Sequence, residues 1–93
     1  MSVYVDELRY YPPTPRWRHG DACHMTADTL EELHAFAGKL QLRRAWFQPH
    51  ERFPHYDLTA RRRAAAVLAG AIEVKVRDYV RSLLKARGEL KNG

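Results

Sequence analysis

All five prolines of this 93-residue chain fall in two short stretches, which limit where regular secondary structure can form. RYYPPTPRWRHGD covers residues 9–21 and holds three of the prolines, and PHERFPHYD covers residues 49–57 and holds the other two. Proline fixes φ, lacks a backbone donor and disfavours helical geometry in the residue before it. Both stretches are therefore expected to be irregular loops, with the regular elements around and between them.

Four short segments rich in β-favouring side chains are predicted to be strands. They are residues 2–6 (SVYVD), 22–26 (ACHMT), 43–48 (RRAWFQ) and 71–77 (AIEVKVR). The first segment places two valines on one face, and the last alternates apolar with charged side chains.

Three helices are predicted from their start signals. Thr29 and Glu32 have the capping-box spacing at the start of LEELHAFAGKL, and Thr59 is a suitable N-cap for ARRRAAAVLA. Asp78 begins a basic C-terminal helix that passes into a frayed tail. The alternating order of strands and helices predicts a single α/β domain over residues 1–93, with a mostly parallel four-stranded sheet flanked by about three helices.

The composition bounds the class of protein. With 45% hydrophobic and 29% charged residues the chain reads as an ordinary globular domain, and no apolar run approaches the roughly 20 residues that span a bilayer. The single cysteine, Cys23, favours a cytoplasmic location and is expected to be an inert core thiol. The net charge of +5 favours anionic partners such as nucleic acid or nucleotides, although it also serves solubility.

Polar side chains gather where the predicted strands end, and in open α/β sheets ligands bind beyond the carboxyl ends of the strands. Helix N-termini at the same edge attract anions through their free N–H groups. The residues expected at this edge to bind an anionic ligand are Gln48, Tyr56, Arg63, Thr29 and Thr59.

A divalent metal site is one interpretation of the imidazoles and carboxylates near this edge. His24 and Asp28 lie in one segment and His55 and Asp57 in another, and such ligands suit zinc or manganese, with magnesium as a further candidate. In the alternative interpretation, the carboxylates assist helix caps and the histidines bond to backbone groups. The spacing matches no established metal motif, so both interpretations stay open.

An acid/base role is a second interpretation of the same residues. His55, next to Asp57 or facing Asp6 across the cleft, has the chemistry of a catalytic general base near neutral pH. The alternative is a loop histidine with satisfied hydrogen bonds. His34, inside the first predicted helix, is expected to be structural or partly exposed.

The chain also resembles a known family through several motifs in order: VYVD, CHMTADTLEELHAFA, RRAWFQ and PHYDLTARRRAAAVLAGAIEV. These motifs are similar to a family of short bacterial and phage proteins known as domain-of-unknown-function family 4031, over roughly residues 3–76. The resemblance implies no particular biochemistry. It implies shared positions at Asp6, His24, Asp28, Glu32, His34, Trp46, Gln48, His55, Tyr56, Asp57 and Arg63.

Two functional hypotheses follow. The first is a domain that binds a nucleotide, a phosphate or nucleic acid, with a divalent metal and hydrolase or nuclease activity. The second is a non-catalytic adaptor that binds nucleic acid or protein through its basic face and C-terminal helix. That helix also offers an apolar seam for a homodimer, formed by Tyr79, Val80, Leu83 and Leu84.

Overall fold

The structure is a computed structural model, and it describes residues 2–15, 17, 20–51, 53–75, 77–78 and 80–81. Two α-helices, one short 3₁₀ helix and six strands lie within these residues. In chain order they are β1 (Val3–Val5), β2 (Arg9–Tyr10), β3 (Asp21–Ala27), α1 (Leu30–Lys39), η1 (Arg44–Trp46), β4 (Phe47–Gln48), β5 (His55–Leu58), α2 (Ala60–Leu68) and β6 (Ile72–Glu73).

The strands form one mixed sheet with the order β4-β5-β3-β1-β6, and β2 pairs with the beginning of β3. All strand pairs are antiparallel except β1 with β6. The expected mostly parallel four-stranded sheet with three helices is therefore wrong, since the described residues form six mostly antiparallel strands and two α-helices. The segment after β1 returns to the sheet as an antiparallel neighbour rather than through a right-handed crossover.

Both helices begin where their caps predict. The Thr29 hydroxyl accepts a hydrogen bond from the Glu32 backbone N–H at 3.1 Å, as in a capping box, and donates to the Glu32 carboxylate at 3.0 Å. The Thr59 hydroxyl accepts from the Arg62 backbone N–H at 3.2 Å. Gly70, at φ +113°, follows the end of α2 in a conformation that favours glycine.

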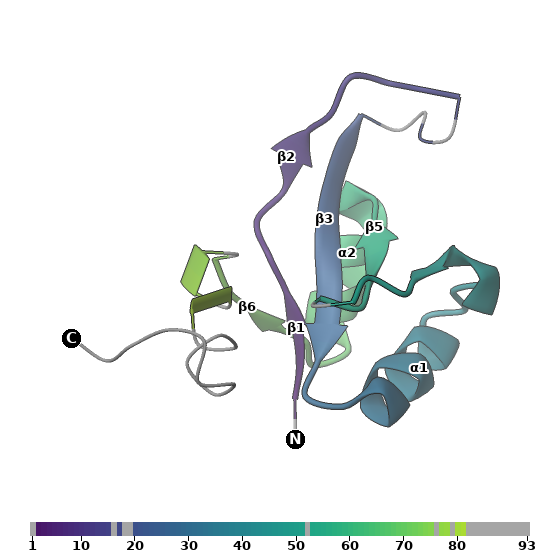
Figure 1. Cartoon of the computed structure of the whole chain (residues 1–93), viewed down its shortest axis with the longest axis vertical. Coiled ribbons are helices and arrows are strands. Elements are labelled where there is room, and N and C mark those ends of the chain that lie inside the picture. Colours follow the sequence, from purple (N-terminus) through teal and green to yellow (C-terminus); the bar gives the residue numbers. More distant parts are fainter. Residues whose placement is uncertain are drawn as a thin grey trace.

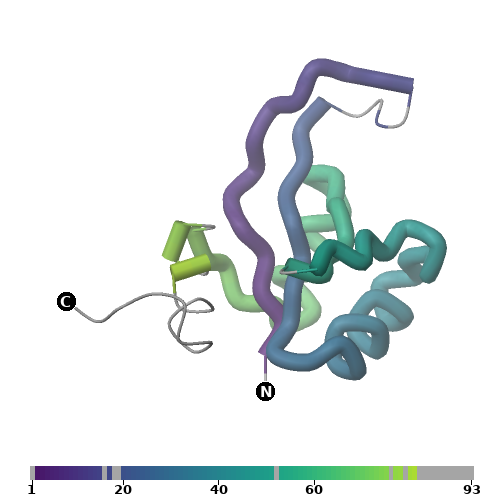
Figure 2. The backbone as a smooth tube through the Cα atoms, viewed as in Figure 1, coloured from purple at the N-terminus to yellow at the C-terminus, as the bar shows by residue number. Residues whose placement is uncertain are grey.

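The hydrophobic core lies between the sheet and its two helices. Val5, Cys23, Met25, Tyr56 and Leu58 supply the strand side of the core. Leu33 and Ala37 of α1 and Ala66 of α2 pack against them. In Figure 1 both helices lie to one side of β3, and the smooth trace in Figure 2 shows β2 and the start of β3 extending beyond this body as a two-stranded ribbon. The helices thus cover one face of the central strands and leave the other face to the polar side chains.

Three segments differ from their predictions in extent or in kind of structure. Half of the predicted strand at residues 43–48 is the helix η1, and only Phe47–Gln48 pairs with β5. The predicted strand at residues 71–77 is reduced to the two residues of β6. Residues 55–57, expected to be part of a loop, form β5 together with Leu58, because Pro49 and Pro54 both precede that strand and interrupt none of its hydrogen bonds.

The C-terminal helix expected from Asp78, and the homodimer seam upon it, fall largely outside the described residues. Within the described ranges, no helix combines the length and apolar character needed to cross a membrane.

Candidate metal centre

Three strands share an alternation that places polar side chains on the face away from the helices. In β1, Val3 and Val5 contribute to the core, so the residues between and after them point to the opposite face. In β3, His24 lies between the buried Cys23 and Met25. In β5, HYDL has the burial pattern intermediate, buried, intermediate, buried, so its histidine and aspartate share the open face.

One row of side chains crosses this face on three neighbouring strands. The register pairs His24 of β3 with Asp57 of β5, and it pairs Val5 with Met25, which brings Asp6 opposite His24. Two hydrogen bonds join Asp6 and His24 at this position: the Asp6 N–H donates to the His24 carbonyl at 3.1 Å, and the His24 N–H donates to the side-chain oxygen Oδ1 of Asp6 at 2.6 Å. Antiparallel pairing thus aligns residues far apart in the sequence.

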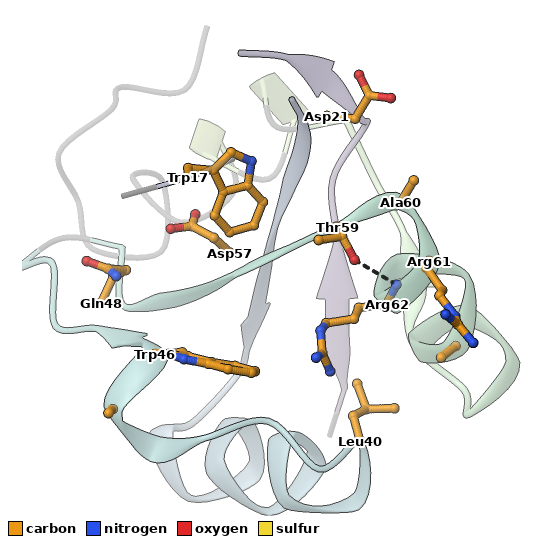
Figure 3. A pocket seen from close by; sticks show the side chains of 12 residues that line it. Trp17, Asp21, Leu40, Trp46, Gln48, Asp57, Thr59, Ala60, Arg61 and Arg62 are labelled. Atoms are coloured by element: carbon orange, nitrogen blue, oxygen red, sulfur yellow. Dashed lines mark hydrogen bonds between the residues drawn. The ribbon is translucent and has the colours of Figure 1, made fainter. Parts of the chain in front are cut away.

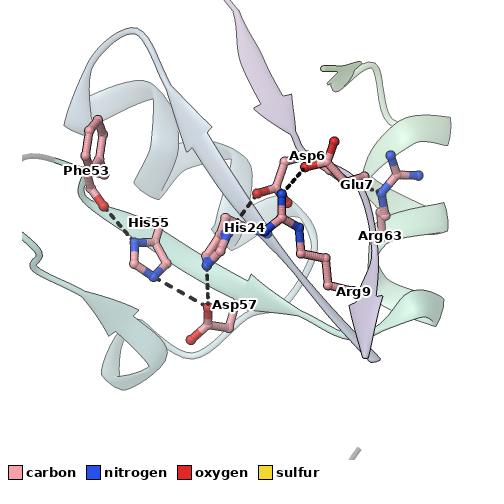
Figure 4. Close-up of polar contacts among 8 residues, drawn as sticks. All are labelled: Asp6, Glu7, Arg9, His24, Phe53, His55, Asp57 and Arg63. Carbon is pink, nitrogen blue, oxygen red and sulfur yellow. Dashed lines mark hydrogen bonds and ion pairs between the residues drawn. The ribbon is translucent and has the colours of Figure 1, made fainter. Parts of the chain in front are cut away.

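The buried carboxylate of Asp6 orients the ring of His24. Asp6 is 5% exposed, and its Oδ2 lies 2.7 Å from His24 Nδ1. The other ring nitrogen, Nε2, points toward Asp57 and lies 3.8 Å from its Oδ1 (Figure 4). Asp6 therefore fixes both the rotation of the imidazole and the position of its proton.

His55 approaches the Asp57 carboxylate as well. Its Nδ1 lies 2.6 Å from the Phe53 carbonyl oxygen, and its Nε2 lies 3.5 Å from Asp57 Oδ1. The rings of His24 and His55 meet edge to face, with centroids 4.7 Å apart. The potential ligand atoms of His24, His55 and Asp57 all lie within 4.8 Å of one another.

The hydrogen bonds assign the same tautomer to both rings. A carbonyl oxygen can only accept, so His55 Nδ1 carries a proton, and the ionised Asp6 carboxylate likewise accepts from His24 Nδ1. In the neutral rings, both Nε2 lone pairs consequently face the negative Asp57 oxygen. That arrangement is unfavourable unless a proton or a cation lies between the nitrogens and the carboxylate.

The pKa of His55 reflects this environment. Burial by itself disfavours the charged ring, but hydrogen bonds from the ring to the Asp57 carboxylate and the Phe53 carbonyl, with the charges of Asp57 and Asp6, together raise the pKa above its ordinary value. The site therefore favours positive charge at His55 Nε2. A metal ion satisfies the same electrostatic demand in place of a proton.

A small cavity of about 260 Å³ opens beside the two histidines. Its apolar part includes Phe53, Val74 and Val80, and its polar part includes His50. The Phe53 backbone N–H donates to His50 Nδ1 at 3.3 Å, so the neutral His50 ring carries its proton on Nε2. His50 thus has the opposite tautomer to His24 and His55, and its Nδ1 lone pair is engaged by the Phe53 N–H.

Two residues support the site from the helix side. Arg63 Nε donates to the Asp6 backbone carbonyl at 2.8 Å, and its NH1 pairs with Glu73 at 2.9 Å, which ties the end of β1 to α2 and β6. Cys23 is buried, as expected, and burial followed by the negative charge of Asp6 raises the pKa of its thiol to about 12. The thiol lies in the core, on the face of β3 opposite to His24, and it is not part of the cluster of ligand atoms.

Other predicted site residues lie outside this group. Asp28 accepts hydrogen bonds from the Ser2 N–H at 2.8 Å and the Tyr4 hydroxyl at 2.9 Å, so it fastens the start of β1 to the end of β3. Thr29 and Thr59 have hydroxyls engaged as helix caps. Sequence reasoning placed these residues at a shared rim with the histidines, but the Asp28 carboxylate and the two hydroxyls are engaged in these local contacts instead.

Tyr56 lies apart from the metal-ligating atoms, whereas Gln48 lies beside them as the cross-strand partner of His55. Tyr56 is 1% exposed on the core face, where its hydroxyl lies 2.9 Å from Nδ1 of His34. This contact gives His34 the structural position expected for it. Gln48 is exposed in β4, opposite His55. Sequence reasoning missed the Phe53 carbonyl that orients His55 and the role of His50. Both depend on hydrogen bonds to the backbone of Phe53, and residue type does not encode backbone contacts.

Comparison with known proteins places the chain without adding biochemistry. No curated protein and no solved structure matches it. The model of the family described as "Protein of unknown function (DUF4031)" matches residues 3–86, which include every strand and both α-helices around the site. The chain therefore belongs to the DUF4031 family.

Proposed function

We propose that this protein binds a divalent transition metal through His24 Nε2, His55 Nε2 and one carboxylate oxygen of Asp57. The observation that carries the proposal is the shared tautomer of the two histidines, each of which donates from Nδ1 to a fixed oxygen and presents Nε2 toward Asp57. Outer hydrogen bonds of this kind orient ligating imidazoles and increase their basicity. Two imidazoles and one carboxylate suit zinc, manganese or iron(II), and three protein ligands leave coordination positions for a substrate.

The chemistry that best fits this site is hydrolysis of a phosphate ester. A divalent metal would supply Lewis acidity toward a phosphoryl oxygen and an attacking water. The protein would contribute a fixed ligand set, a cavity with an apolar wall that limits water, and His50 as a hydrogen-bond donor to the substrate. The net charge of +5 supports an anionic substrate.

Calorimetric titration of chelator-treated protein with zinc or manganese tests metal binding. We expect one ion per chain, and we expect His24→Ala, His55→Ala and Asp57→Ala each to weaken binding by more than about 100-fold, since even outer-shell partners contribute roughly 10- to 100-fold. Asp28→Asn is the matched carboxylate control and should bind normally. Absence of binding, or equal weakening by the control, would exclude this centre.

Hydrolysis is measured separately with bis-p-nitrophenyl phosphate in the presence of manganese or zinc. The wild-type protein should hydrolyse it, whereas His50→Ala should keep its metal affinity and lose activity. If the wild-type protein binds metal but does not hydrolyse this substrate, the metal centre stands and the proposed hydrolytic reaction is refuted.

A further inference from the structure

A second concave surface lies along the edge of the sheet, between η1 with β4 and the first turns of α2. It encloses about 1230 Å³ and includes Asp57, so it adjoins the proposed metal centre. Figure 3 shows the side chains of Trp17 and Trp46 on one side of this groove and those of Arg61 and Arg62 on another. The residues that line it are Trp17, Asp21, Leu40, Ala45, Trp46, Gln48, Asp57, Thr59, Ala60, Arg61, Arg62 and Ala65.

An aromatic ring and a guanidinium group meet at the wall of this groove. The guanidinium carbon of Arg62 lies 5.0 Å from the centre of the Trp46 ring, within the range of a cation–π contact. Trp46 is nevertheless 38% exposed, and Arg61, which lines the same groove, is also exposed. The contact holds a flat aromatic surface and a positive charge next to each other in an open groove.

We infer that this groove binds single-stranded nucleic acid. Bases of any sequence stack on exposed aromatic rings, and arginines at the same surface contact the phosphates, which is the combination that single-strand-binding proteins use. The volume of about 1230 Å³ exceeds the range of roughly 300–1,000 Å³ that is typical of small-molecule pockets, so it favours a strand over one mononucleotide. Duplex is disfavoured because its bases already stack on one another.

The inference deepens the proposed function and rests on it for the charge balance of the groove. Asp57 lines the groove and also belongs to the proposed metal centre, and its negative charge opposes a phosphate unless a bound cation offsets it. Asp21, the other carboxylate of the groove, is exposed at the start of β3. A strand held by Trp46 and Arg62 would therefore present a phosphodiester to the metal centre at the Asp57 end.

Fluorescence anisotropy with a fluorescein-labelled oligothymidine on the order of twelve nucleotides long tests the inference. We expect Trp46→Ala to weaken binding by about 5- to 100-fold and Trp46→Phe to restore most of the affinity, since stacking on one ring has this magnitude. Arg62→Ala should weaken binding and reduce the salt slope by about 0.7, the value for one phosphate contact on a single strand. Thermal unfolding would check that each variant remains folded.

Arg9→Ala is the matched charge control, because Arg9 is an exposed arginine of β2 outside the groove and pairs with Glu7. It should leave affinity nearly unchanged. No binding by the wild-type protein, equal loss in Arg9→Ala, no effect of Trp46→Ala, or competition by thymidine monophosphate at equal affinity would overturn the inference.

The metal titration and the anisotropy assay fail independently. In the presence of chelator, His24→Ala should still bind the oligonucleotide as well as wild type does under the same conditions. Metal binding without strand binding would refute the inference about the groove and leave the proposed metal centre standing. Strand binding without metal binding would refute the proposed metal centre, and with it the inference that the groove presents a substrate to that centre.

Discussion

Replacing Asp6 with asparagine tests the proposed orientation of the His24 ring. The Asp6 carboxylate accepts at both oxygens, from the His24 backbone N–H at 2.6 Å and from His24 Nδ1 at 2.7 Å. An asparagine whose oxygen keeps the backbone bond must turn its NH₂ group toward Nδ1. Nδ1 would then have to accept rather than donate, so the proton of the neutral ring would move to Nε2 and block the nitrogen that faces Asp57.

The expected effect on metal affinity follows from this change of tautomer. Outer-shell partners of ligating histidines contribute about 10- to 100-fold to metal affinity, which corresponds to roughly 1.4–2.8 kcal/mol. We expect the upper part of this range, because Asp6 is 5% exposed and water has little access to replace the lost acceptor. Calorimetric titration with zinc measures the affinity, and ¹H–¹⁵N spectra of the imidazole nitrogens report the tautomer of His24 directly.

Glu7→Gln is the control for this experiment. Glu7 is the next carboxylate in the chain, but its side chain pairs with Arg9 at 3.2 Å and is not among the clustered ligand atoms. It should bind zinc as the wild-type protein does. If Asp6→Asn keeps full affinity, or if its His24 keeps the proton on Nδ1, the orienting role of Asp6 is refuted.

Three further predictions concern other parts of the molecule. In NMR titrations of the metal-free protein, His55 should titrate above the ordinary pKa of 6.5, and His34, whose pKa is lowered by burial and then by Arg44, should titrate below it. The raised pKa of His55 therefore adds stability that is present below pH 6.5 and is lost as the pH rises through the pKa of the folded protein. The lowered pKa of His34 has the opposite effect, because the fold becomes less stable as the pH falls from 6.5 through the folded pKa of His34. If His34 titrated above His55, both environments would be contradicted. Leu58→Ala should lower the free energy of unfolding by about 2–5 kcal/mol in urea denaturation, since Leu58 is fully buried, and a loss below about 1 kcal/mol would be inconsistent with its core position. Cys23, with a thiol pKa of about 12, should resist iodoacetamide at neutral pH until the protein is unfolded, and rapid alkylation of the native protein, detected by mass spectrometry, would argue against its burial.

The residues of the candidate site could be predicted from the sequence, but the way in which they come together could not. His24, His55, Asp57 and Asp6 were all identified as candidates by residue type, and the structure brings them together. The reason given for their convergence was wrong, because it assumed parallel strands that meet at one edge. The alternation of HYDL was the overlooked signal: its polar residues share one face and its apolar residues the other, which is the pattern of a half-buried strand.

The sequence by itself determined the local features of this protein: the starts of α1 and α2, because a Thr hydroxyl bonds to the backbone three residues ahead, and the two-faced character of the strands, because side chains alternate every second residue. Only the tertiary structure decided which strands are neighbours and in which direction they run. Strand pairing joins backbone groups far apart in the chain, and those groups are chemically alike in every residue, so no local pattern specifies the partner. The row of Asp6, His24 and Asp57 exists because packing against the two helices selected one register among many.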